Sequence, residues 1–118
     1  MQYMLLCCFD ENRWNAIPEP QRDVIMQDYG AFIEKHTENG SYLGGGKLDG
    51  SNTATTLRQE NGKAIITDGP FAETKEQLGG YHIVECANET EALEIAQRIP
   101  TLPAGGTIEV RPLLHVTG

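Results

Sequence analysis

The side chains best suited to chemistry gather near the middle of the chain, where Asp68, Glu73 and Lys75 fall within eight residues. At a strand end beside a cleft, a carboxylate could take up a proton and an ammonium group could hold an anion. Asp68 is therefore a candidate catalytic base, and all three are candidate ligand-binding residues. A plainer interpretation also fits: Asp68 hydrogen-bonds the backbone of the turn at Gly69-Pro70, and Glu73 and Lys75 belong to a solvated charged surface.

Two further candidates lie on predicted strands. His82 shares a strand face with Val84 and Cys86, and histidine is the side chain that titrates near neutral pH, so His82 is a second candidate base. A histidine on an apolar face is, however, more often a packed residue with one hydrogen bond. Arg111 could clamp an anionic ligand, or pair with Glu109 on the same face of its strand.

Metal, phosphate and thiol sites are not indicated. The three histidines lack metal-ligand spacing and a neighbouring cysteine cluster, so we expect no zinc site. Gly44-Gly45-Gly46 has no following Lys-Ser/Thr, which a phosphate loop requires. Cys7 and Cys8 are adjacent on a predicted strand and point to opposite faces, so we interpret the cysteines as reduced core residues. We accordingly expect no metal and no cofactor.

The hydrophobic pattern predicts one domain over residues 1–118, in the order β-α-β, hairpin, β-α-β. Two helices behind a mostly antiparallel sheet, with a hairpin inserted at the middle, make a ferredoxin-like α+β fold. The hairpin is indicated by Asn61-Gly62 and the second helix by the capping box at Asn88–Glu91. The predicted strands are residues 3–9, 42–48, 53–58, 63–67, 81–86 and 107–114. The predicted helices run from Pro20 to Gly40 and from Asn88 to Pro100. We expect residues 10–17 to form a loop and residues 72–78 to form a short helical turn.

The first strand, Tyr3–Phe9, is apolar at odd and even positions alike. Such a strand is typical of a sheet covered on both faces, yet two helices can cover only one. We therefore expect the other face to meet a second copy, which gives a two-fold homodimer. On the second strand, the three glycines indicate either a bulge or a place where another group approaches the backbone closely.

Composition excludes several classes of protein. The chain has 118 residues and a formal charge of −8, with its nine Lys and Arg residues scattered, so direct nucleic-acid binding is not expected. No run approaches the roughly 18 apolar residues that a membrane helix needs, and the N-terminal segment lacks the features of a signal peptide. We expect a cytoplasmic protein without a membrane segment.

Residues 67–81, TDGPFAETKEQLGGY, closely resemble the signature of the YCII-related family, in the subgroup named after the letters DGPF. The resemblance covers nearly the whole chain and implies a dimeric α+β barrel on a ferredoxin-like fold. YCII-like members have a proposed His/Asp catalytic dyad, whose matching positions here are Tyr29 and Glu38. A neutral phenol is a poor base, so the dyad's chemistry is not carried over, but Tyr29 can donate a hydrogen bond to a ligand oxygen.

Three functions follow from these observations and from the resemblance. The first is a small dimeric protein that binds an anionic or aromatic metabolite in a cleft between sheet and helices. The second is an enzyme of the isomerase or lyase kind, as in the wider superfamily, with His82 or Asp68 as base and Tyr29 or Arg111 polarising a carbonyl. The third is a protein partner of an extracytoplasmic-function sigma factor, which the resemblance implies because DGPF members of the family are also found fused to, or encoded near, such factors.

Overall fold

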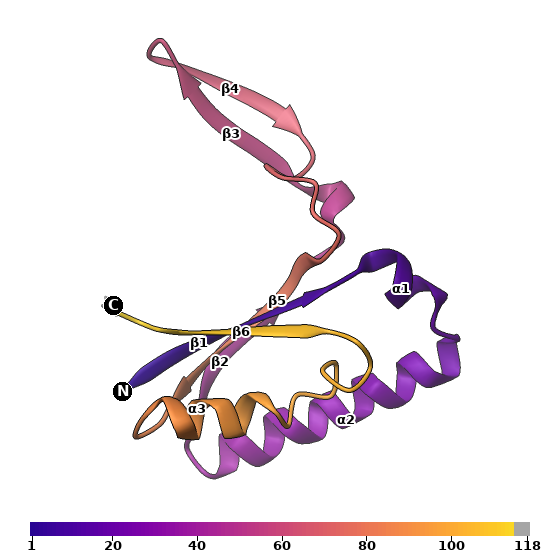
Figure 1. Ribbon diagram of the computed structural model, residues 1–118, viewed down its shortest axis with the longest axis vertical. Helices are drawn as coiled ribbons and strands as arrows, with labels where there is room; N and C mark the ends of the chain where they lie inside the picture. The colour runs from indigo at the N-terminus through magenta and orange to yellow at the C-terminus, as the bar shows by residue number, and fades with distance from the viewer. Residues whose placement is uncertain (115–118) are drawn as a thin grey trace.

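The computed structural model of the chain describes residues 1–114 and confirms the α+β fold class (Figure 1). Four strands form an antiparallel sheet in the order β2-β5-β1-β6, and β3 and β4 form a separate hairpin. The strands are β1 (Gln2–Phe9), β2 (Tyr42–Lys47), β3 (Thr55–Glu60), β4 (Lys63–Asp68), β5 (Gln77–Glu85) and β6 (Thr107–Pro112). The helices are α1 (Glu11–Ala16), α2 (Glu19–Glu38) and α3 (Glu89–Ala96), with a 3-10 turn at Ser51–Thr53.

The core lies between one face of the sheet and the two longer helices. Alternate residues of β1, Tyr3, Leu5 and Cys7, are buried on this face. They belong to one apolar cluster with Phe32 from α2 and Ile95 from α3, and Figure 1 shows both helices on the same side of the sheet. Met4, Leu6 and Cys8 point to the opposite face, which no helix of the described chain covers, and are only half-buried.

Local signals account for the two longer helices. Pro20 lies in the first turn of α2, and Gly40, with φ of 82°, follows its end. The side chain of Asn88 accepts a hydrogen bond from the Glu91 N–H (3.0 Å), and the Glu91 carboxylate accepts one from the Ala87 N–H (3.1 Å). This reciprocal pair is the predicted capping box at the start of α3.

Two local predictions are wrong. Residues 10–17 were expected to form a loop, but Glu11–Ala16 form α1, because the Asp10 side chain accepts hydrogen bonds from the Asn12 and Arg13 N–H groups and caps the helix. Residues 72–78 were expected to form a helical turn. They are irregular until β5 begins at Gln77, and the Gln77 side chain instead donates to the backbone carbonyls of Ala72 and Thr74.

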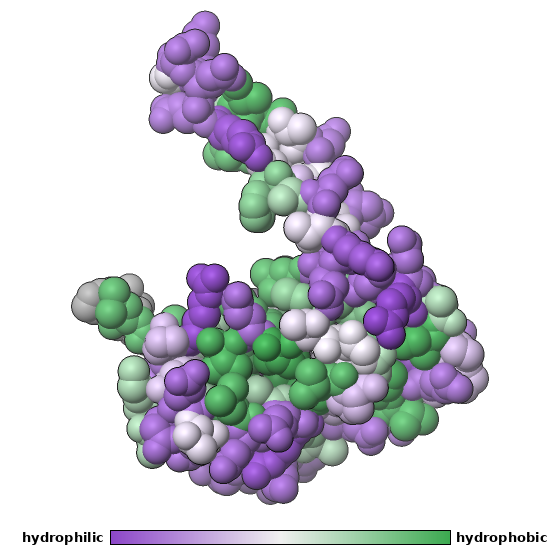
Figure 2. Space-filling model, in the orientation of Figure 1, coloured by the Kyte–Doolittle hydropathy of each residue, from purple (hydrophilic) through white to green (hydrophobic). Residues whose placement is uncertain are grey.

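The β3–β4 hairpin projects from the body as an arm (Figure 1). Its turn has positive φ at Asn61 (51°) and Gly62 (78°), which is the geometry that an Asn-Gly hairpin turn adopts. Leu57 and Ile66 lie opposite each other across the strands and are 66% and 70% exposed. Figure 2 shows a hydrophilic tip on this arm, with apolar side chains below it.

Within residues 1–114, no helix combines the length and the hydrophobicity that crossing a lipid bilayer would need.

Candidate functional site

A cavity of about 700 Å³ lies between α2 and the sheet and extends to α1. That volume is typical of a small-molecule site. Its walls are mainly apolar, and the side chains that make them so are Phe9, Trp14, Met26, Ile33 and Leu48. Phe9 and Trp14 pack edge to face with ring centroids 5.5 Å apart, which gives one wall two aromatic rings.

Three polar side chains from different elements meet in this cavity. His82 on β5 is 4% exposed and has a tyrosine on each ring nitrogen. The Tyr29 hydroxyl, from α2, hydrogen-bonds Nε2, and the Tyr42 hydroxyl, from β2, hydrogen-bonds Nδ1 at 2.8 Å. Tyr29 also lies 3.5 Å from Cys7 Sγ on β1. All four side chains line the cavity.

Gly45 makes room for this arrangement. It lies beside His82 in the β2–β5 register, and a Cβ atom there would fall 2.5 Å from Tyr42 Oη and 2.8 Å from His82 Nδ1, and would clash with the Tyr81 carbonyl. Any larger residue must displace one of these groups. The close approach predicted from the three glycines is confirmed at this residue, whereas a Cβ at Gly44 would meet nothing within 4 Å.

Burial keeps all four polar groups neutral at physiological pH. It lowers the pKa of His82 to about 4, because charging the imidazole away from water is unfavourable. Burial also raises the pKa of Tyr29, Tyr42 and Cys7 above their ordinary values. A neutral imidazole has one donor and one acceptor nitrogen, so one tyrosine donates to His82 and the other accepts from it.

The charged groups around the cavity would not stabilise a bound anion. Its lining includes one ammonium group, Lys47, and two carboxylates, Glu11 and Asp49. The remaining polar lining side chains are uncharged. The cavity is thus an apolar space with neutral hydrogen-bonding groups, which suits an uncharged ring that carries an oxygen substituent.

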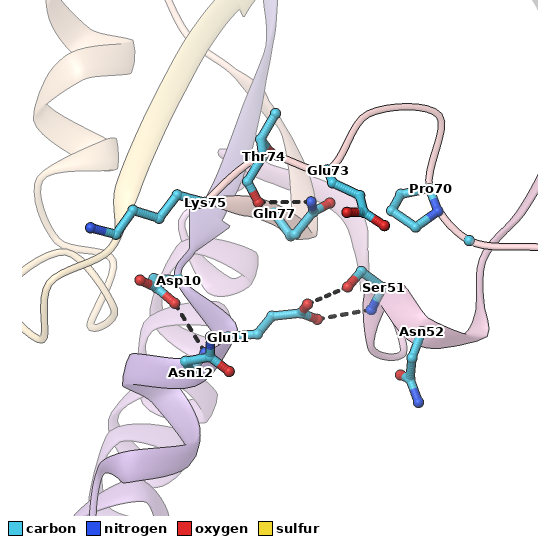
Figure 3. A pocket seen from close by; sticks show the side chains of 11 residues that line it. Asp10, Glu11, Asn12, Ser51, Asn52, Pro70, Glu73, Thr74, Lys75 and Gln77 are labelled. Carbon is cyan, nitrogen blue, oxygen red and sulfur yellow. Dashed lines mark hydrogen bonds between the residues drawn. The ribbon is translucent and has the colours of Figure 1, made fainter.

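Glu73 and Lys75 lie elsewhere, at a second cavity of about 470 Å³ between the 69–77 loop and the start of α1. Figure 3 shows them pointing to opposite sides of this space. Glu11 closes one side by accepting hydrogen bonds from the Ser51 hydroxyl and from the Ser51 N–H, the latter at 2.8 Å. Lys75 shares the lining of this cavity with three carboxylates, Asp10, Glu11 and Glu73, so the net negative charge opposes an anionic ligand.

Asp68 and Arg111 line neither cavity. Asp68 is exposed at the end of β4, and the Gly69 N–H after it donates to the Ala54 carbonyl at 2.7 Å, which continues the β3–β4 pairing. Arg111 on β6 pairs with Glu109 at 3.0 Å on the open face of the sheet, with 70% of its side chain exposed. Of the predicted residues, the structure brings together Tyr29 and His82.

Tyr42 and Cys7 were not predicted as site residues. The sequence pattern identifies Tyr42 only as the start of a strand and Cys7 only as a core residue; the run of glycines after Tyr42 is the one available signal of a site. Within residues 1–114, no three His, Cys, Asp or Glu side chains lie close enough together to hold a metal ion. His115 lies outside the described residues.

A family model described as the YCII-related domain matches residues 1–117. An uncharacterised protein of Rhizobium meliloti (strain 1021) is 40% identical over 114 residues, which span 96% of this chain and 92% of that protein.

Proposed function

Because the chain belongs to the YCII-related family and folds around an apolar cavity with neutral hydrogen-bonding groups, we propose that it binds a small aromatic or other cyclic molecule with an oxygen substituent. The observation that carries this proposal is the meeting of Tyr29, His82 and Tyr42 in the cavity. The tyrosine hydroxyl groups, which His82 holds in place through both ring nitrogens, bind the polar end of the ligand, and the aromatic wall of Phe9 and Trp14 packs against its ring.

Of the two ligand classes expected from the sequence, the aromatic class fits this cavity better than the anionic one. An anion would lose its hydration among uncharged groups, with Lys47 offset by Glu11 and Asp49. A phenol or a cyclic ketone keeps one hydrogen bond to a tyrosine and places its apolar part against apolar walls.

A ligand of this class should stabilise the folded protein. We expect 2-naphthol to raise the melting temperature saturably, because a ligand that binds only the folded state at 100 times its Kd adds about 2.7 kcal/mol to the free energy of unfolding. The charged analogue 2-naphthoate should be the weaker ligand. Thermal unfolding at increasing ligand concentration measures both, and an absence of saturable stabilisation by 2-naphthol contradicts the proposal.

Two variants test whether 2-naphthol binds in this cavity. Trp14→Ala removes part of the aromatic wall and should weaken 2-naphthol binding about tenfold, which corresponds to about 1.4 kcal/mol. Phe71→Ala removes an equally apolar ring that is 78% exposed and lies outside the cavity lining, so it should leave Kd unchanged. Titration calorimetry measures both values.

We further propose that the protein is a homodimer in which the open face of the sheet is buried. The chain exposes 8094 Å², about 1,800 Å² more than the roughly 6,300 Å² expected of a compact monomer of its mass. The projecting arm contributes to this excess, which is in the range that one subunit of a stable homodimer buries. Half-buried apolar residues of the open face, Met4, Leu6 and Ile83, support this location.

The dimer should be measurable as a mass of twice 13.0 kDa in solution at micromolar protein. Ile83→Glu places a charge on the open face and should shift the protein to monomer. Val24→Glu introduces the same negative charge at a 55% exposed site on α2 and should leave the dimer intact. Light scattering after size exclusion tests both variants, and a monomeric wild-type protein contradicts the dimer. The cytoplasmic location and a sigma-factor partner stay predictions.

A further inference from the structure

Four hydrogen-bonding groups from three strands and one helix form a continuous row in the cavity. Cys7 Sγ lies 3.5 Å from the Tyr29 hydroxyl, which bonds His82 Nε2, and His82 Nδ1 lies 2.8 Å from the Tyr42 hydroxyl. Both ends of the row, Cys7 and Tyr42, line the same cavity as its middle. A molecule bound there can therefore meet the two ends of one hydrogen-bond chain.

Counting protons shows that the row has two states. The neutral thiol, two phenols and imidazole carry four exchangeable protons, and three hydrogen bonds use three of them. If Tyr42 accepts a hydrogen bond from His82, every hydrogen bond in the row is donated in the direction from Cys7 to Tyr42, and the Tyr42 proton is free to bind a ligand. If Tyr42 donates a hydrogen bond to His82, the donor and acceptor of every hydrogen bond are exchanged, and the Cys7 proton is free instead. The four groups thus reverse together, since His82 cannot donate or accept at both nitrogens while neutral.

We propose that the row Cys7–Tyr29–His82–Tyr42 is a proton wire that interconverts the keto and enol forms of a cyclic carbonyl compound bound in the cavity. This inference rests on the proposed binding function and adds the class of substrate. The substrate needs an acidic C–H beside its carbonyl, because the wire removes one proton and delivers another.

The transfer balances without charging the protein. Tyr42 gives its proton to the carbonyl oxygen, His82 Nδ1–H replaces that proton, Tyr29 passes its proton to Nε2, and Cys7 passes its proton to Tyr29. Cys7 Sγ then takes the proton released from the α-carbon. The C–H electron pair becomes the C=C bond of the enol, and the π pair of the C=O bond forms the new O–H bond. The S–H and O–H protons of the wire exchange with solvent, so in D2O reversal of every step returns the ketone with deuterium at its α-carbon and restores the original direction of the wire.

The surroundings favour a neutral wire. The titratable groups that face His82 are Tyr29 from α2 and Tyr42 from β2, with Cys7 from β1 beyond Tyr29. Lys47, Glu11 and Asp49 share the cavity but form none of the wire's hydrogen bonds. Because burial disfavours the charged form of every wire group, a concerted shift of neutral groups avoids the cost of an isolated buried ion.

The test uses 2-tetralone, an enolisable ketone of nearly the same size and shape as 2-naphthol. Exchange of its α-hydrogens in D2O is followed by proton NMR with the full-length protein and with buffer alone. We expect the protein to accelerate exchange, and 2-naphthol to inhibit it competitively. If 2-naphthol binds but exchange stays at the buffer rate, the wire is overturned and the binding function stands. If neither compound binds, both are overturned.

Variants distinguish the wire from a single base. Tyr42→Phe and Cys7→Ala each remove one end and should lower the catalysed rate on the order of 100-fold, in the range of general acid–base effects. Cys7→Ser restores a group that gives and takes a proton and should recover most of the rate lost in Cys7→Ala. Tyr81→Phe, on the opposite face of the sheet, is the matched control and should keep the wild-type rate. If either end variant that still binds 2-naphthol exchanges 2-tetralone at the wild-type rate, the wire is overturned.

Discussion

Gly45→Ala should abolish 2-naphthol binding and lower the free energy of unfolding by about 3 kcal/mol, the upper end for forcing extra atoms into a packed site. The added methyl group would fall 2.5 Å from Tyr42 Oη and 2.8 Å from His82 Nδ1. Since the backbone of Tyr81 blocks the remaining side, the contact is relieved only by separating Tyr42 from His82. Urea unfolding and calorimetric titration measure the two losses.

The neighbouring glycine provides the control. A methyl group at Gly44 meets nothing within 4 Å, so Gly44→Ala should change the free energy of unfolding by less than about 1 kcal/mol and leave binding intact. Equal behaviour of the two variants would mean that Tyr42 and His82 are not held together as the structure places them.

Acid should destabilise the protein through His82. Its folded-state pKa of about 4 lies below the ordinary value of 6.5, so the unfolded state binds more protons between these two values. The free energy of unfolding therefore falls as the pH drops from about 6.5 to 4, and this contribution is fully present only above that range. Integration of the shift gives a loss of about 3 kcal/mol between pH 7.5 and 4.

His82→Gln isolates this contribution, because glutamine keeps hydrogen-bonding capacity but does not titrate. The difference between the wild-type and variant free energies of unfolding, measured in urea at pH 7.5 and at pH 4, should shrink by about 3 kcal/mol on acidification. The comparison cancels the effects of the other titrating groups. A difference that stays constant with pH contradicts a buried, neutral His82.

Local signals predicted the fold well where a few adjacent residues decide the structure. Asn61-Gly62 identified the hairpin, and Asn88 with Glu91 identified the start of α3, because both motifs satisfy their backbone groups locally. The six-residue helix α1 was missed since its apolar pattern is too short to show a period, and only the Asp10 cap defines it.

The site was less predictable because it depends on register. Tyr29 and His82 were each identified, yet they are 53 residues apart, and the β2–β5 register brings Tyr42 to the second ring nitrogen. Asp68, by contrast, looked close to Lys75 in sequence, but it ends a hairpin that projects from the body. Closeness along the chain therefore did not predict which side chains form the site.

A crystal structure of the protein with 2-naphthol would show directly where the ligand binds. We expect the naphthalene ring against Trp14 and Phe9, with its hydroxyl within hydrogen-bond distance of Tyr42 or Tyr29. A ring found instead in the smaller cavity beside Lys75, or on the exposed residues of the arm, would contradict the proposed binding site.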